Sequence, residues 1–105
     1  MDLNIKPVSV ERVKGFWRHP ELPKWDLKTS REDVGKWADL NKISLVCVLM
    51  EKDATQEFID SWYADGLDDC SPWIPTSPAR NAFLLSIHDH VDGPQAWFAI
   101  PQSML

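Results

Sequence analysis

The sequence predicts an α+β fold: a largely antiparallel sheet of three main strands with helices packed on one face. Residues 81–100 form two apolar stretches joined by Asp92-Gly93-Pro94, a pattern that predicts a C-terminal β-hairpin. The run from Ile43 to Met50 is β-branched and apolar on both sides, which is typical of a central strand. A chain of 105 residues can build one core, so we expect a single domain over residues 1–105.

The first part of the chain predicts a short helix followed by a loop. Ser9 is a suitable N-cap, and Val10, Val13 and Trp17 follow it at helical spacing. Prolines at positions 20 and 23 then remove two backbone donors and favour extended conformations around them. We therefore expect a loop between this helix and the next.

A second helix precedes the predicted central strand. Thr29 and Ser30 stand three residues before Glu32 and Asp33, which is the spacing of a capping box. Apolar residues at helical spacing follow, and the pattern ends at Asn41, a residue that often terminates helices.

A third helix and a long loop lead from the strand to the hairpin. Phe58 and Trp62 lie on the apolar face of a helix predicted over residues 54–64, which Gly66 ends. Residues 67–80 hold three prolines and several turn residues, so they are expected to form a loop.

The charge pattern argues against nucleic acid as a partner. The formal net charge is −5, the pI is near 5.0, and the Lys and Arg residues are scattered along the chain. Non-specific affinity for nucleic acid comes mainly from basic groups at phosphates, so an acidic chain without a basic stripe is a poor candidate. The field of this chain favours a protein partner with a basic surface.

The sequence predicts neither a membrane segment nor a signal peptide. The longest uninterrupted apolar run, Leu45 to Met50, is six residues long. No apolar region follows the first charged residues, so we expect a cytoplasmic protein without membrane contact. Cys47 and Cys70 belong to no CxxC pair and are expected to be free thiols, which suits that compartment.

No catalytic motif stands out in the sequence. Cys47 has apolar neighbours that raise the pKa of a thiol, and Cys70 follows two aspartates whose charge disfavours the thiolate. Ser61 and Ser86 lack the glycines of a nucleophile elbow, and the four glycines are too dispersed to form a phosphate-binding loop. We therefore expect a protein that is not an enzyme and that uses no cofactor.

One cluster offers a metal site as the alternative. His88 and His90 would point to the same face of a strand, and Asp92 or Cys70 would supply a third ligand. The solvent face of a hairpin near its turn is also where polar side chains belong. We favour solvent-facing histidines, and the runner-up is a metal-binding protein or metal-dependent enzyme that uses His88, His90 and Asp92.

The six tryptophans carry the functional argument. Trp37, Trp62 and Trp97 lie on predicted helix or strand faces and are expected in the core. Trp25 and Trp73 stand in proline-bracketed loops, where periodic burial does not explain them. Each either plugs the end of the core or is a preorganised anchor for a protein partner, and we take both as candidate binding residues.

The C-terminal part of the chain carries a family-like pattern, in three segments: Cys70-Ser-Pro-Trp-Ile-Pro-Thr-Ser-Pro78, Phe83-Leu-Leu-Ser-Ile-His-Asp89 and Asp92-Gly-Pro-Gln-Ala-Trp97. Over about residues 70–100 it resembles small uncharacterised proteins encoded by bacteriophages and prophages. In that pattern the middle of the loop usually carries glycines, where this chain has Ser77-Pro-Ala-Arg80. The resemblance implies a phage or prophage origin, and hence the cytoplasm of a bacterial host, but it implies no activity.

The sequence therefore predicts a small non-enzymatic protein-interaction module, an accessory protein that binds a host or phage macromolecule. An acidic mimic of nucleic acid would need its carboxylates gathered on one face, and this sequence spaces them too evenly.

Overall fold

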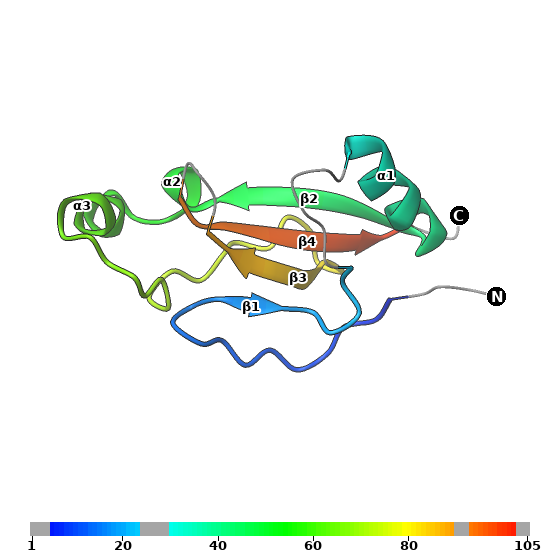
Figure 1. Ribbon diagram of the computed structural model, residues 1–105, viewed down its shortest axis with the longest axis horizontal. Helices are drawn as coiled ribbons and strands as arrows, with labels where there is room; N and C mark the ends of the chain where they lie inside the picture. The colour runs from blue at the N-terminus through cyan, green and yellow to red at the C-terminus, as the bar shows by residue number, and fades with distance from the viewer. Residues whose placement is uncertain (1–4, 24–29, 90–92, 103–105) are drawn as a thin grey trace.

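The computed structural model describes residues 5–23, 30–89 and 93–102, and it confirms the α+β class (Figure 1). The sheet has four strands where the sequence predicted three, because a two-residue strand joins it near the N-terminus. In chain order the elements are β1 (Trp17–Arg18), α1 (Arg31–Leu40), β2 (Ile43–Leu49), α2 (Met50–Asp53), α3 (Gln56–Ala64), β3 (Phe83–His88) and β4 (Gln95–Pro101).

Neighbouring strands are all antiparallel, in the order β1-β3-β4-β2. β2 is thus an outer strand of the described sheet, and the prediction that it is the central strand is wrong. Its apolar residues on both sides reflect contacts above and below the strand. That pattern does not tell whether each edge of the strand has a hydrogen-bonded neighbour.

The sheet has a buried cluster on each face, because successive residues of β4 point to opposite sides. We call face A the side of Ala96 and Phe98, and face B the side of Trp97 and Ala99. The other buried residues of the face A cluster are Met50, Trp62, Cys70, Trp73 and Ile87. Those of the face B cluster are Ile5, Leu22, Ala38, Ile43 and Leu85.

The two main helices contribute to clusters on opposite faces of the sheet, and Figure 1 shows α3 beyond the end of β2. Trp62 of α3 belongs to the face A cluster, whereas Ala38 of α1 belongs to the face B cluster. The sequence predicted helices on one face, and this expectation does not hold. Both sides of the central strands are apolar, so each side carries its own buried cluster.

The helix predicted near the N-terminus is wrong, and a reverse turn takes its place. Lys14 and Gly15 have positive φ angles of 54° and 87°, and Val13 and Phe16 exchange backbone hydrogen bonds of 2.8 and 2.9 Å. A two-residue turn with two positive φ angles suits the twist of antiparallel strands. A Cβ at Gly15 would lie 2.5 Å from the backbone of Cys70, so the turn packs tightly against the 67–80 loop.

α1 begins after Ser30, one of the two predicted caps, and ends at Asn41 as predicted. The Ser30 hydroxyl accepts a hydrogen bond from the Asp33 N–H (3.1 Å), and the Asp33 carboxylate accepts one from the Ser30 N–H (3.3 Å). Asn41 is the C-cap, and its side-chain oxygen accepts from the Ile5 N–H (2.9 Å). Asn41 thereby joins the end of the helix to the N-terminal segment.

The helix predicted over residues 54–64 is present as α3. It begins slightly later than predicted because the Thr55 hydroxyl caps it by accepting from the Phe58 N–H (3.2 Å). The chain leaves the helix at Gly66, whose φ of 61° favours glycine. The predicted loop over residues 67–80 follows.

The predicted C-terminal hairpin is confirmed as β3 paired with β4. Its turn lies partly outside the described residues, although Gly93 has a φ of 102°. A β-bulge shifts the register between Leu84 and Ser86, so Leu85 is the extra residue of the strand.

The bulge reverses the faces to which later residues of β3 point. Phe83 packs with the face B cluster, whereas Ile87, four residues later, belongs to the face A cluster. In an uninterrupted strand these two side chains would share a face, and the inserted residue separates them. Ser86 and His88 are directed to face B for the same reason.

Candidate binding site

A row of side chains crosses the sheet on face B. Directly opposite residues of antiparallel strands project to the same side. Trp97 of β4 lies opposite Cys47 of β2 and Ser86 of β3, and Ser86 in turn lies opposite Arg18 of β1. One surface thus combines residues from all four strands.

Hydrogen bonds and ring contacts fix the side chains of this row. The Gln95 side-chain oxygen accepts from the Cys47 thiol (2.9 Å) and from the Trp97 indole N–H (2.9 Å). The Ser86 Oγ and the His88 Nδ1 lie 2.8 Å apart and share a hydrogen bond. The Trp97 and His88 rings meet edge to face, with centroids 5.1 Å apart and an interplanar angle of 83°. The surface is therefore preorganised.

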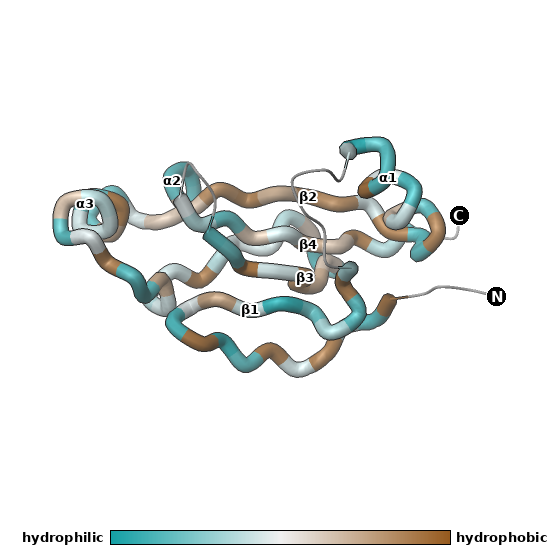
Figure 2. The backbone as a smooth tube through the Cα atoms, viewed as in Figure 1, coloured by the Kyte–Doolittle hydropathy of each residue, from teal (hydrophilic) through white to brown (hydrophobic). Residues whose placement is uncertain are grey.

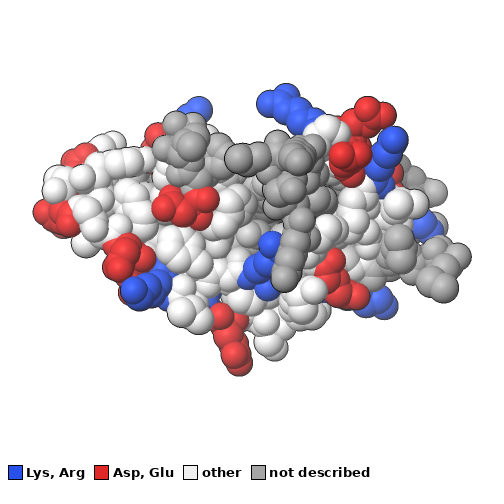
Figure 3. Space-filling model, in the orientation of Figure 1, with Lys and Arg blue, Asp and Glu red and all other residues white. Residues whose placement is uncertain are grey.

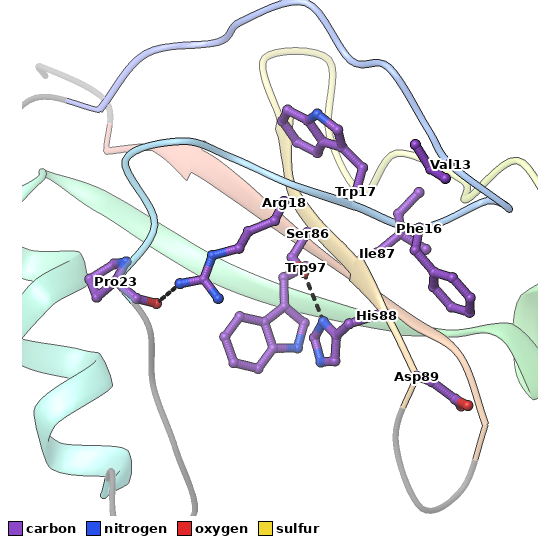
Figure 4. Close-up of a pocket in the computed structure, with 10 residues that line it drawn as sticks. All are labelled: Val13, Phe16, Trp17, Arg18, Pro23, Ser86, Ile87, His88, Asp89 and Trp97. Carbon is purple, nitrogen blue, oxygen red and sulfur yellow. Dashed lines mark hydrogen bonds between the residues drawn. The ribbon is translucent and has the colours of Figure 1, made fainter.

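A cleft of about 690 Å³ opens beside the row, where the chain around β1 diverges from β3. β1 pairs with β3 at only two positions, and the Val13–Phe16 turn lies beyond them. Figure 4 shows Arg18, His88 and Trp97 together on one side of the β1 and β3 ribbons, whereas Trp17 projects from β1 in the opposite direction, so the cleft extends around this edge of the sheet. The lining is mainly aromatic and aliphatic, with a few polar groups.

Arg18 and His19 hold the chain that forms one wall of the cleft. The Arg18 Nη2 donates to the carbonyl of Leu22 (2.7 Å) and to that of the next residue. His19 is fully buried, and its Nδ1 accepts from the Glu21 N–H (3.0 Å). Its Nε2 therefore carries the proton and donates to the Lys6 carbonyl (2.6 Å).

The pairing of Ser86 with His88 raises the question of catalysis. A serine nucleophile needs a base within hydrogen-bonding distance, and it also needs access to the substrate and donors for an oxyanion. The 2.8 Å contact meets the first requirement, but Ser86 is only 5% exposed. The geometry of this cleft therefore favours binding over acyl transfer.

Trp73, one of the two tryptophans predicted to bind a partner, fills the core. It is 3% exposed and packs in the face A cluster, which corresponds to the core plug that the sequence left open. It therefore offers no exposed indole to a partner. Trp25 lies outside the described residues, so its role as an anchor stays a prediction.

Asp53 holds the loop around Trp73 in place. Its carboxylate accepts from the Trp73 indole N–H (2.9 Å) and from the Thr76 N–H (2.9 Å). Partial burial raises the pKa of Asp53, but these hydrogen bonds outweigh that effect and the pKa is lowered overall.

The metal alternative has one of its three residues in the described part of the chain. His88 is half-buried and bonded to Ser86, whereas His90 and Asp92 lie outside the described residues. Among the residues that the structure describes, no three His, Cys, Asp or Glu side chains come close enough to hold a metal ion. A site at His88, His90 and Asp92 stays a prediction.

Both cysteines are free thiols, as predicted. Burial raises the pKa of Cys47 even though the residue is exposed overall, and the hydrogen-bonded indole of Trp97 opposes that rise only in part. Burial also raises the pKa of Cys70, and the nearby Arg12 guanidinium offsets it only in part. Neither thiol is activated as a nucleophile.

Sequence reasoning singled out His88, as a possible metal ligand, but it missed the other residues proposed here to make up the cleft. It placed Trp17 on a helix that does not form and assigned Trp97 to the core, where it is in fact half-buried. The pair Lys14-Gly15 between apolar residues was the available signal, because glycine in a short turn often marks a hairpin.

The remaining surface gives little further direction. Acidic and basic side chains are interspersed on the face shown in Figure 3. None of the helices in the described part of the chain has the length and apolarity that crossing a membrane requires. No protein-family model matches the chain, and the comparisons with curated proteins and with solved structures found no match either.

Proposed function

We propose that this chain is a non-enzymatic protein-interaction module and that the cleft beside β1 and β3 is its binding site. The observation that supports the proposal is the cleft itself, with a volume of about 690 Å³ and an aromatic lining. Sites that take a ligand or an anchoring side chain are concave and mostly apolar, with a few well-placed polar groups. Trp17 and Trp97 supply the apolar surface, and Arg18 and His88 supply polar groups.

The partner in this proposal is a protein that inserts an apolar or aromatic side chain into the cleft. Burial of that side chain against the aromatic lining of the cleft supplies most of the affinity. The net charge of −5 attracts a partner whose surface around the inserted side chain is basic. We place this interaction in the cytoplasm of a bacterial host, where the protein acts as a phage or prophage accessory factor.

Two exposed aliphatic residues allow a matched test. Val13 is 74% exposed at the cleft, and Ile74 is 79% exposed on the 67–80 loop, outside the cleft. Val13→Asp and Ile74→Asp introduce the same charge at β-branched, exposed positions, so both variants should keep the stability of the unmodified chain within about 0.5 kcal/mol.

The binding measurement uses the tagged chain to capture a partner from a bacterial lysate, followed by titration calorimetry with the purified partner. Val13→Asp should weaken the interaction by about 2 kcal/mol, because a carboxylate at the cleft opposes insertion of an apolar group. Ile74→Asp should leave the affinity unchanged. Equal affinities of the two variants for the partner would show that the cleft is not the binding site.

A further inference from the structure

Within the described part of the chain, the outer edge of β2 has no neighbouring strand, and the register identifies the backbone groups that face outward. At one end of the β2–β4 ladder the Met50 N–H donates to the Pro94 carbonyl, and at the other end the Gln102 N–H donates to the Lys42 carbonyl. Hydrogen-bonded and non-hydrogen-bonded pairs alternate along an antiparallel ladder. The even-numbered residues of β2 therefore direct their N–H and C=O groups to β4, and the odd-numbered residues direct theirs to the outer edge.

The middle of this edge is open within the described part of the chain. Ile43 and Leu49 lie at its ends, where the Ile43 carbonyl accepts from the Gln102 side chain (3.2 Å) and Leu49 leads into α2. Between them, no described residue donates to or accepts from the backbone of Leu45 or Cys47. The backbone N–H and C=O groups of Leu45 and Cys47 thus face outward.

β2 also lacks the features with which proteins usually block strand pairing at an edge. Charged side chains, prolines, bulges and very short strands serve that purpose. β1, at the opposite edge of the sheet, is only two residues long. β2 has seven residues, Ile-Ser-Leu-Val-Cys-Val-Leu, without a charge, a proline or a register break, and Figure 2 shows it as an apolar strand.

We propose that β2 pairs with β2 of a second copy of this chain, antiparallel about a two-fold axis at Val46. In that register Leu45 lies opposite the partner's Cys47, and Ile43 lies opposite the partner's Leu49. Every outward-directed residue then meets another outward-directed residue, and each such pair can exchange two N–H···O bonds. The two four-stranded sheets become one continuous sheet.

The sequence of β2 and its flanks fits a second copy. The strand is uncharged, so two copies meet without like charges in contact. Lys42 precedes the strand and Glu51 follows it, and the two-fold axis brings Lys42 of each copy close to the partner's Glu51. A register shifted by two residues in either direction would leave an outward-directed residue of each strand without a strand partner. The pairing about Val46 is closed, so it stops at a dimer.

Sedimentation equilibrium of the full chain measures the association. The unmodified chain should form a reversible dimer. Cys47→Pro removes an outward N–H at an exposed position without removing a bond to β4, and edge strands tolerate proline there. The dissociation constant of the dimer should rise about ten- to a hundredfold, because the symmetric dimer loses two hydrogen bonds. Cys47→Val is the matched control and should dimerise like the unmodified chain.

Cross-linking tests the register. The Val46 pair would be non-hydrogen-bonded with Cα atoms about 4.5 Å apart, within the range of a disulfide. Ser44 and the partner's Ser44 would be offset by about 13 Å along the strands, too far for a disulfide. In a Cys47→Ser background, Val46→Cys should therefore oxidise to a covalent dimer while Ser44→Cys should not. Cys70 is fully buried and does not compete.

The outcomes decide the proposal directly. A folded, unmodified chain that stays monomeric up to millimolar concentration would overturn it, as would a dimer that Cys47→Pro leaves intact. Equal cross-linking at positions 44 and 46 would overturn the two-fold register. Circular dichroism of each variant separates a lost dimer from a lost fold.

Discussion

Gly15 is the position where a single methyl group should test the docking of the N-terminal turn. Its φ of 87° lies in the region that favours glycine, so any other residue there costs about 1 kcal/mol. A Cβ would also lie 2.5 Å from the Cys70 carbonyl carbon and from the Ser71 nitrogen. These are backbone atoms, so the loop has to shift, at a cost of about 1 to 3 kcal/mol. Gly15→Ala should thus destabilise the protein by about 2 to 4 kcal/mol.

Two other glycines separate the contributions to this cost. Gly66 has a φ of 61°, and nothing lies within 4 Å of a Cβ built there, so Gly66→Ala should cost only about 1 kcal/mol. Gly35 lies in α1 with open space around it, so Gly35→Ala should stabilise the protein by about 0.5 to 1 kcal/mol. The difference between Gly15→Ala and Gly66→Ala isolates the contact with the Cys70 backbone.

Urea unfolding followed by tryptophan fluorescence measures all three variants, and an unchanged m-value shows that the comparison is sound. Each kcal/mol corresponds to a shift of about 4 to 8 °C in Tm for a domain of this size. If Gly15→Ala and Gly66→Ala cost the same within about 0.5 kcal/mol, the turn does not pack against the loop as described.

Three further substitutions test other parts of the fold by the same urea assay. Trp73→Ala should cost about 3 to 5 kcal/mol as a core cavity, and a cost below about 1 kcal/mol would contradict the burial of this indole. Asp53→Asn should cost about 1 kcal/mol at pH 7 through weakened hydrogen bonds. The lowered pKa of Asp53 stabilises the fold above about pH 4, so this difference should shrink as the pH falls through the folded-state pKa, and a constant difference between pH 7 and pH 3 would refute the assignment. Ser30→Ala should cost about 1 kcal/mol through loss of the α1 cap, whereas an unchanged midpoint would show that the cap contributes nothing.

Local signals account for what the sequence could predict. The ends of α1 follow from Ser30, Asp33 and Asn41, whose hydrogen bonds involve residues close by in the chain. The hairpin follows from two apolar stretches separated by a turn. In each case the physical cause lies within one window of sequence, so a single chain is enough to reveal it.

Features that depend on distant partners could not be read in this way. The outer position of β2 depends on which strands find β4, and an apolar strand has the same composition in either place. The bulge at Leu85 lets apolar residues of β3 pack in the clusters on both faces of the sheet. The composition of β3 does not reveal this bulge.

The cleft was harder still to predict, because it exists only where β1 meets β3. Val10, Val13 and Trp17 have a spacing that also fits a helix, and positive φ at Lys14 and Gly15 overrides it. The indole of Trp73 looked like an anchor because it stands between prolines, but its N–H reaches the Asp53 carboxylate across the fold.

The order of the strands also sets the order in which the protein can assemble. Trp17 pairs with Ile87, and about two thirds of the chain lies between them, whereas β3 and β4 are neighbours in sequence. Closing so long a loop costs chain entropy before any contact compensates for it, so local pairings form more readily. During synthesis β1 leaves the ribosome long before β3, so it cannot pair until β3 has been synthesised. We therefore expect the wall of the cleft to be the last part of the sheet to form and the first that local unfolding releases.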